Sequence, residues 1–82
     1  MKKTFTVYNV KIDFFDQAQS NFKQVVIVID DIKGMFIRKV SDIEDYYVVI
    51  TSYGYVIVNE KDWFDIKNIL LILNSNLRAV VD

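Results

Sequence analysis

The chain has 82 residues, of which 52 % are hydrophobic and 26 % are charged, a composition typical of one folded domain rather than a disordered segment. A domain of this size buries only about 60 % of the surface that its unfolded chain exposes, so burial against a second subunit would add stability. Cysteine and histidine are both absent, which excludes disulfides, metal sites built on these residues and the usual nucleophile–base pairs. We therefore expect no enzymatic activity, no catalytic residue, no metal and no cofactor.

The N-terminal segment carries two lysines but no continuous apolar stretch, so it does not resemble a signal peptide. The longest apolar runs, residues 25–29 and 69–73, are far shorter than the roughly 20 residues that a bilayer requires. We expect a cytoplasmic protein without a membrane partner. The proline-free composition, rich in lysine, asparagine and isoleucine, is typical of an AT-rich coding sequence, which suits a bacterium or its phage.

Charge is divided unevenly along the chain, although the net charge is only −1. Residues 1–40 carry seven basic and four acidic residues, whereas residues 41–82 carry three basic and seven acidic residues. The sequence therefore leaves room for a basic surface in the N-terminal half.

The strands are predicted from alternation and turn residues. Residues 8–14 alternate apolar and polar side chains, and Phe5 and Val7 have the opposite phase, which indicates a bulge or a short preceding strand. The β-branched run at residues 25–29 predicts a central strand that turns at Gly34 into residues 35–40, forming a hairpin. Residues 46–51 and 55–58 are expected to pair through a turn at residues 52–54.

The C-terminal helix begins after Asn59, a good N-cap, and is expected to end near residue 78. One stripe with three-and-four spacing suits packing on a sheet, with Trp63 as a core residue: Trp63, Ile66, Leu70, Leu73 and Leu77. Further large apolar residues lie outside this stripe, which indicates a second buried surface. Helix-to-helix pairing in a homodimer would supply it, with Ile69, Leu71 and Ile72 at the interface.

The last third of the chain resembles the positive cofactor four family of transcriptional coactivators, which bind single-stranded DNA. The similarity lies in residues 59–69, with their asparagine, acidic helix start, tryptophan and aliphatic–lysine pair, and in the aliphatic–arginine tail at residues 77–80. Residues 26–34 are similar to the first β-hairpin of that family. The resemblance covers residues 23–80.

The resemblance implies an α+β fold: a curved antiparallel sheet of four or five strands, followed by one C-terminal helix through which two copies dimerise. We expect a single domain over residues 1–82, with a strand and loop in 1–22, the sheet in 23–58 and the helix in 59–78. It also implies sequence-tolerant binding of single-stranded DNA in transcription, replication or recombination, with duplex DNA and RNA left open as further ligands. Lys23 and Lys33 correspond to basic residues of the family's hairpin.

Three hairpin positions depart from the family: Asp30, Ile32 and Met35 replace an arginine, a stacking phenylalanine and a lysine. Binding of single-stranded DNA would then need other basic and aromatic side chains in place of these three. Arg38 and Lys39 are candidates for phosphate contacts, although alternation lets only one of them face a given side of the sheet. Tyr53 and Tyr55, which flank Gly54, are candidates for stacking on bases. The alternative function is a small protein-binding module or an inhibitor of a host protein, which suits the acidic C-terminal half.

Overall fold

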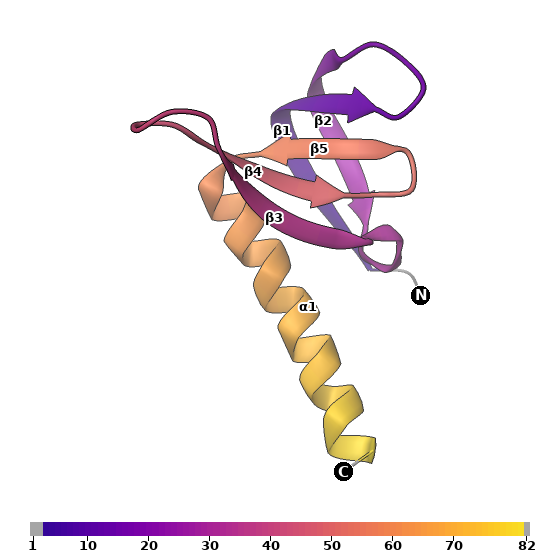
Figure 1. Ribbon diagram of the computed structural model, residues 1–82. Helices are drawn as coiled ribbons and strands as arrows, with labels where there is room; N and C mark the ends of the chain where they lie inside the picture. Colours follow the sequence, from indigo (N-terminus) through magenta and orange to yellow (C-terminus); the bar gives the residue numbers. More distant parts are fainter. Residues whose placement is uncertain (1–2, 82) are drawn as a thin grey trace.

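A computed structural model describes the backbone of residues 3–81 and the side chains of residues 3–73. The described chain has an antiparallel sheet followed by a long helix (Figure 1), which confirms the predicted α+β class. In chain order the elements are β1 (Thr4–Phe14), β2 (Ser20–Val28), the short 3-10 helix η1 (Ile29–Asp31), β3 (Gly34–Lys39), β4 (Asp45–Ile50), β5 (Gly54–Val58) and α1 (Glu60–Val81).

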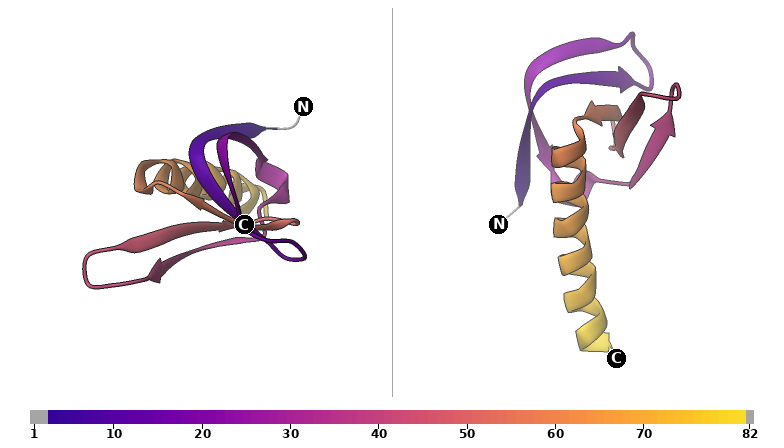
Figure 2. Two further views of the ribbon diagram at one scale, coloured as in Figure 1. Left: turned by 90° about the horizontal axis from the view of Figure 1, so that it is seen from above. Right: turned by 90° about the vertical axis from the view of Figure 1, so that its left-hand side faces the viewer.

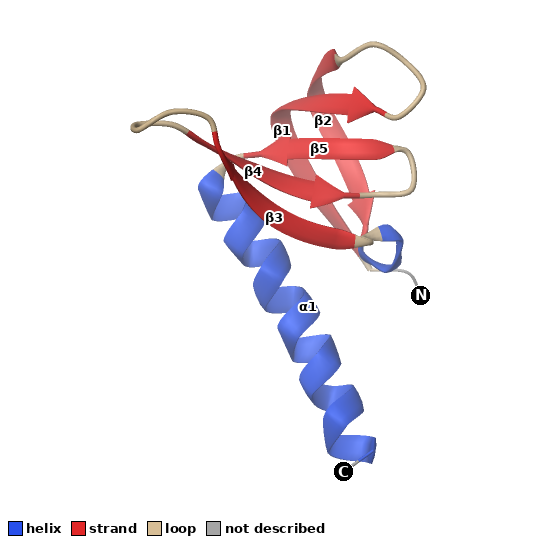
Figure 3. Cartoon of the chain, viewed as in Figure 1, coloured by secondary structure: helices blue, strands red, loops and turns tan. Residues whose placement is uncertain are grey.

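The five strands lie in the order β2-β1-β5-β4-β3, with every neighbouring pair antiparallel (Figure 3). The pairing of β1 with β5 joins distant parts of the chain, since Lys11 lies opposite Ile57. The N-terminal strand is therefore an interior strand of the sheet, and β2 and β3 form its two edges.

The prediction of a hairpin that turns at Gly34 is wrong. The two strands that flank this turn, β2 and β3, do not pair and lie at opposite edges of the sheet. Instead of reversing the chain, η1 and the residues after it carry it from one edge to the other. Ile29 is buried, and its N–H donates to the carbonyl of Lys3 at 2.9 Å. Asp31 accepts a hydrogen bond from the Ser52 hydroxyl at 2.9 Å, which ties the crossing segment to the β4–β5 turn. Gly34 does not have a positive φ.

The change of phase in β1 occurs at Asn9, which has a φ of 54°. Asparagine tolerates this left-handed conformation better than most residues. Val7 pairs with Val25 and Val10 pairs with Phe22, so neither strand gains a residue between these pairs. The expected bulge or separate short strand is therefore replaced by a local kink in one continuous strand, which keeps both Val7 and Val10 buried.

The core lies between one face of the sheet and the first half of α1. Its buried side chains come from four strands and the helix: Val7, Val10, Ile12, Ile27, Val49, Val56, Val58, Trp63 and Ile66. Trp63 is 5 % exposed, and its indole N–H donates to the Val48 carbonyl at 3.0 Å, so its predicted core role is confirmed. This bond satisfies the one polar group that the ring brings into the core.

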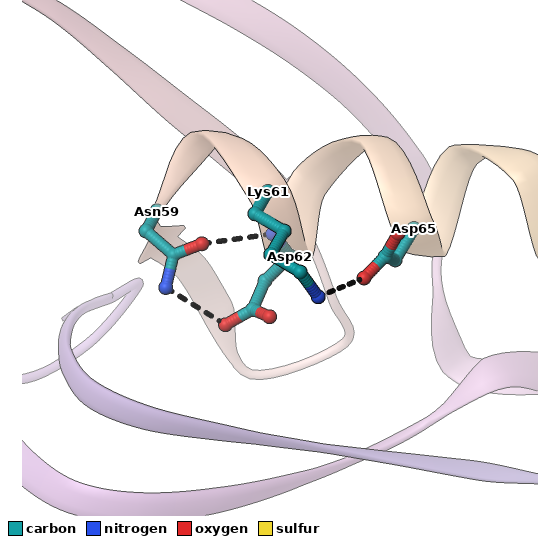
Figure 4. A network of polar contacts seen from close by, with 4 residues as sticks. All are labelled: Asn59, Lys61, Asp62 and Asp65. Atoms are coloured by element: carbon teal, nitrogen blue, oxygen red, sulfur yellow. Dashed lines mark hydrogen bonds and ion pairs between the residues drawn. The ribbon is translucent and has the colours of Figure 1, made fainter.

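The start of α1 has the predicted cap (Figure 4). The side-chain oxygen of Asn59 accepts a hydrogen bond from the backbone N–H of Asp62 at 2.8 Å, and its amide nitrogen donates to the Asp62 carboxylate at 3.0 Å. Lys61 pairs with Asp65 one turn later at 3.1 Å. These contacts fix the point at which the chain leaves β5 and enters the helix.

The helix is longer than expected, since it continues to Val81 rather than to residue 78. Its first turns pack on the sheet, and its second half extends beyond the sheet (Figures 1 and 2). None of the helices in the described part of the chain combines the length and the apolar character that a membrane crossing requires.

Candidate functional site

The face of the sheet opposite the helix carries an unusual set of polar and aromatic side chains, which we call the outer face. The register places these side chains on one side of the sheet, because directly opposed residues of antiparallel strands share a face. Asp13 lies opposite Tyr55, Arg38 opposite Tyr46, and Phe36 opposite Val48. Four strands, β1, β5, β4 and β3, therefore contribute to the outer face.

A groove of about 220 Å³ lies on the outer face. This volume is below the roughly 300–1,000 Å³ of sites that enclose a drug-sized ligand, so the groove suits a flat group held against the sheet. Its apolar and aromatic lining comes from Phe36, Tyr46, Val48, Tyr55 and Ile57. Its polar lining comes from Asp13, Gln19 and Arg38.

Three rings form a continuous row that begins in the groove with Phe36 and Tyr55 and ends beside it at Phe15. Tyr55 lies at the centre, 5.2 Å from Phe15 and 6.0 Å from Phe36 between ring centroids. Both contacts are edge-to-face, with interplanar angles of 83°. All three rings are exposed, Tyr55 to 37 % and Phe15 to 56 %. The row therefore offers ring surface that the chain itself does not cover.

Arg38 and Lys39 are separated by the register of β3. Arg38 lies opposite Tyr46 and lines the groove, whereas Lys39 is the next residue of the strand and has the opposite orientation. Both side chains are exposed. Of this pair, Arg38 is the residue that can bind an anion lying in the groove.

Tyr53 and Tyr55, the two candidates for stacking, do not share an environment. Tyr55 belongs to β5, whereas Tyr53 is half-buried against the core, 6.1 Å from the Phe14 ring between centroids. Burial raises the pKa of the Tyr53 hydroxyl above its ordinary value. The geometry therefore assigns Tyr53 to packing and leaves Tyr55 in the groove.

Lys23 and Lys33 are exposed but lie away from the groove. Lys23 belongs to the edge strand β2, and Lys33 precedes β3 with its N–H bonded to the Ile50 carbonyl at 2.7 Å. Because β2 and β3 are at opposite edges, these two lysines do not form the hairpin pair that the resemblance implied.

The proposed dimer residues lie where α1 leaves the sheet. Leu71 and Ile72 are 51 % and 61 % exposed, and Ile69 is partly buried. Phe64, one heptad before Leu71, is 41 % exposed. Within the described side chains, the sheet thus leaves a substantial apolar helix surface uncovered.

Several residues of the groove were not singled out from the sequence. Tyr46 and Phe36 had a usable signal, because alternation around the β3–β4 and β4–β5 turns places them on the same face as Tyr55. Asp13 and Gln19 had no such signal, since Asp13 reaches the groove through the pairing of β1 with β5 and Gln19 through the loop that follows β1.

Comparison with protein-family models, with curated proteins and with solved structures finds no match.

Proposed function

We propose that this protein is a homodimeric, sequence-tolerant binder of single-stranded DNA that uses the groove on the outer face. The observation that carries the proposal is the placement of Arg38 beside exposed rings, Tyr55 and Phe36, in one groove. Proteins that bind single strands combine basic side chains along the backbone with aromatic rings on which bases stack. The proposal includes a cytoplasmic role in transcription, replication or recombination.

Stacking supplies most of the expected affinity, because the groove contains few charges. Arg38 is the one basic residue that lines it, Lys11 lies nearby opposite Ile57, and Asp13 opposes them with a negative charge. Each stacked base contributes about 1–3 kcal/mol in binders of this type. We therefore expect a shallow dependence of affinity on salt compared with strongly basic proteins.

A dimer would present two grooves to one strand. The exposed apolar surface at Leu71 and Ile72 supports pairing through the helix, because a second copy would cover side chains that the sheet leaves in water. Two linked grooves raise the effective affinity for a strand long enough to reach both.

Arg38 and Lys39 offer a matched pair of variants for testing the site. Arg38→Ala should weaken binding of an oligothymidylate roughly tenfold at 50 mM salt, and should reduce the slope of log affinity against log salt by about 0.7, because one phosphate contact is lost. Lys39→Ala removes the same charge from the other side of the strand and should leave both quantities nearly unchanged. Fluorescence anisotropy at several salt concentrations measures both. Equal effects of the two variants would reject the groove as the site.

Binding to a protein is the second candidate, and the edge strand β3 favours it. Ile37 and Val40 are 46 % and 48 % exposed on or beside this edge, and an edge strand offers unpaired backbone groups to an added strand. If the chain binds no oligonucleotide at low salt, single-strand binding is refuted and protein binding is favoured.

A further inference from the structure

One polar side chain of the groove, that of Asp13, cannot bind phosphate. Asp13 and Gln19 line the groove together with Arg38. A carboxylate only accepts hydrogen bonds and repels a phosphate group, whereas an amide both donates and accepts. If a DNA strand lies in this groove, the group facing Asp13 must therefore be a hydrogen-bond donor, and the donors within a DNA strand are on the edges of its bases.

The carboxylate of Asp13 is available for such a contact. Asp13 is half-buried in β1 and lies opposite Tyr55, so the sheet fixes the position of its backbone. Among the side chains of residues 3–73, the one ion pair joins Lys61 to Asp65, and the side-chain hydrogen bonds do not involve Asp13. Both carboxylate oxygens are thus free to accept hydrogen bonds from a ligand in the groove.

We propose that the groove accepts every base but prefers guanine, an inference that rests on the proposed sequence-tolerant binding of single strands. The Watson–Crick edge of guanine presents two adjacent donors, N1–H and the N2 amino group, which match the two oxygens of one carboxylate. The neighbouring O6 is an acceptor, which suits the amide N–H of Gln19. Unpaired bases are read on this edge when they are splayed onto aromatic side chains.

The other bases fit this pair of side chains less well. Adenine and cytosine each present one amino donor beside a ring nitrogen that repels the second carboxylate oxygen. Thymine presents a single N3–H between two carbonyl groups. Arg38 is separated from Asp13 in the sheet by β5 and β4, which leaves it free to bind the phosphate while the base edge faces Asp13.

The test compares three 12-mers: oligothymidylate, the same strand with one central guanine, and the same strand with hypoxanthine in place of that guanine. Hypoxanthine keeps N1–H and O6 but lacks the N2 amino group. Since a bidentate contact discriminates by about 1–3 kcal/mol, the guanine strand should bind at least about fivefold more tightly than oligothymidylate. The hypoxanthine strand should bind with intermediate affinity.

Two variants locate the effect. Asp13→Asn keeps the shape of the side chain but removes one acceptor oxygen and the negative charge, and it should reduce the guanine advantage to about twofold or less. Asp16→Asn removes the same charge from an exposed loop residue outside the groove and should preserve the advantage. Circular dichroism confirms that both variants are folded.

The outcomes separate the two proposals. Equal binding of the guanine and thymine strands by the unmodified protein, or an advantage that survives in Asp13→Asn, overturns the guanine proposal and leaves single-strand binding intact. Absence of binding to all three strands at low salt overturns both.

Discussion

Replacing Leu71 with aspartate should convert the proposed dimer into a folded monomer. The side chain is 51 % exposed in the single chain, so the substitution leaves the core of the monomer in place. In a helix-to-helix interface the new carboxylate would be buried without a partner, which costs several kcal/mol. We expect the dissociation constant of the dimer to rise at least about hundredfold, as measured by sedimentation equilibrium.

Gln17→Glu is the matched control for this substitution, because it adds the same negative charge to an exposed loop far from α1 in sequence. It should sediment as the unmodified protein does. Pairing through the helix would be contradicted if the unmodified chain is a monomer at micromolar concentration. It would also be contradicted if the Leu71→Asp variant remains a dimer.

Replacing Gly54 with alanine should destabilise the fold strongly, because β5 approaches β1 closely at this residue. An added Cβ would lie 2.5 Å from the carbonyl oxygen of Asp13 and 2.9 Å from the Cα of Phe14. Both are backbone atoms, so relief requires the two strands to separate. Overpacking of this kind costs about 1–3 kcal/mol or more, which corresponds to a fall in melting temperature of roughly 5–20 °C for a domain of this size.

Gly34→Ala provides the control, since neither glycine has a positive φ and only the available space differs. A Cβ at Gly34 would meet the end of the Ile50 side chain at 3.3 Å, and that side chain can move. Thermal unfolding of the two variants should show a small change for Gly34→Ala. Similar melting temperatures for both variants would show that the β1–β5 contact adjusts easily.

The local elements could be predicted from the sequence because their signals are local. Alternation, a β-branched run and turn residues indicated the strands, but the expected central strand at residues 25–29 forms the end of the edge strand β2 and the start of η1. The buried Trp63 and the cap at Asn59 followed from helix spacing and residue type. The pairing of β1 with β5 could not be predicted, because Lys11 and Ile57 are far apart in the chain and no periodicity records which strands meet.

The error at residues 30–34 has a physical cause. Aspartates followed by a glycine are typical of a turn, but turn chemistry does not specify whether the chain reverses beside its own strand or crosses to another edge. Here β2 already pairs with β1, and the burial of Ile29 directs the chain across the end of the sheet. The same crossing separates Lys23 from Lys33.

The assignment of the groove depended on register rather than on residue type. Arg38 and Lys39 are equivalent in the sequence, and Tyr53 and Tyr55 are both aromatic residues beside a glycine. Only the pairing of β3 with β4 and of β5 with β1 shows that Arg38 and Tyr55 lie on the outer face. Sequence alone could therefore identify the candidates but could not separate the site residues from their neighbours.

A titration of the ¹⁵N-labelled protein with a 12-mer oligonucleotide, followed by two-dimensional NMR, locates the surface that binds the strand. We expect the largest shifts of backbone amide signals on the outer face, at Asp13, Arg38, Tyr46 and Tyr55, with small shifts at Lys23, Lys33 and Lys39. Shifts confined to the helix or to those three lysines, or no shifts at low salt, would contradict binding in the groove.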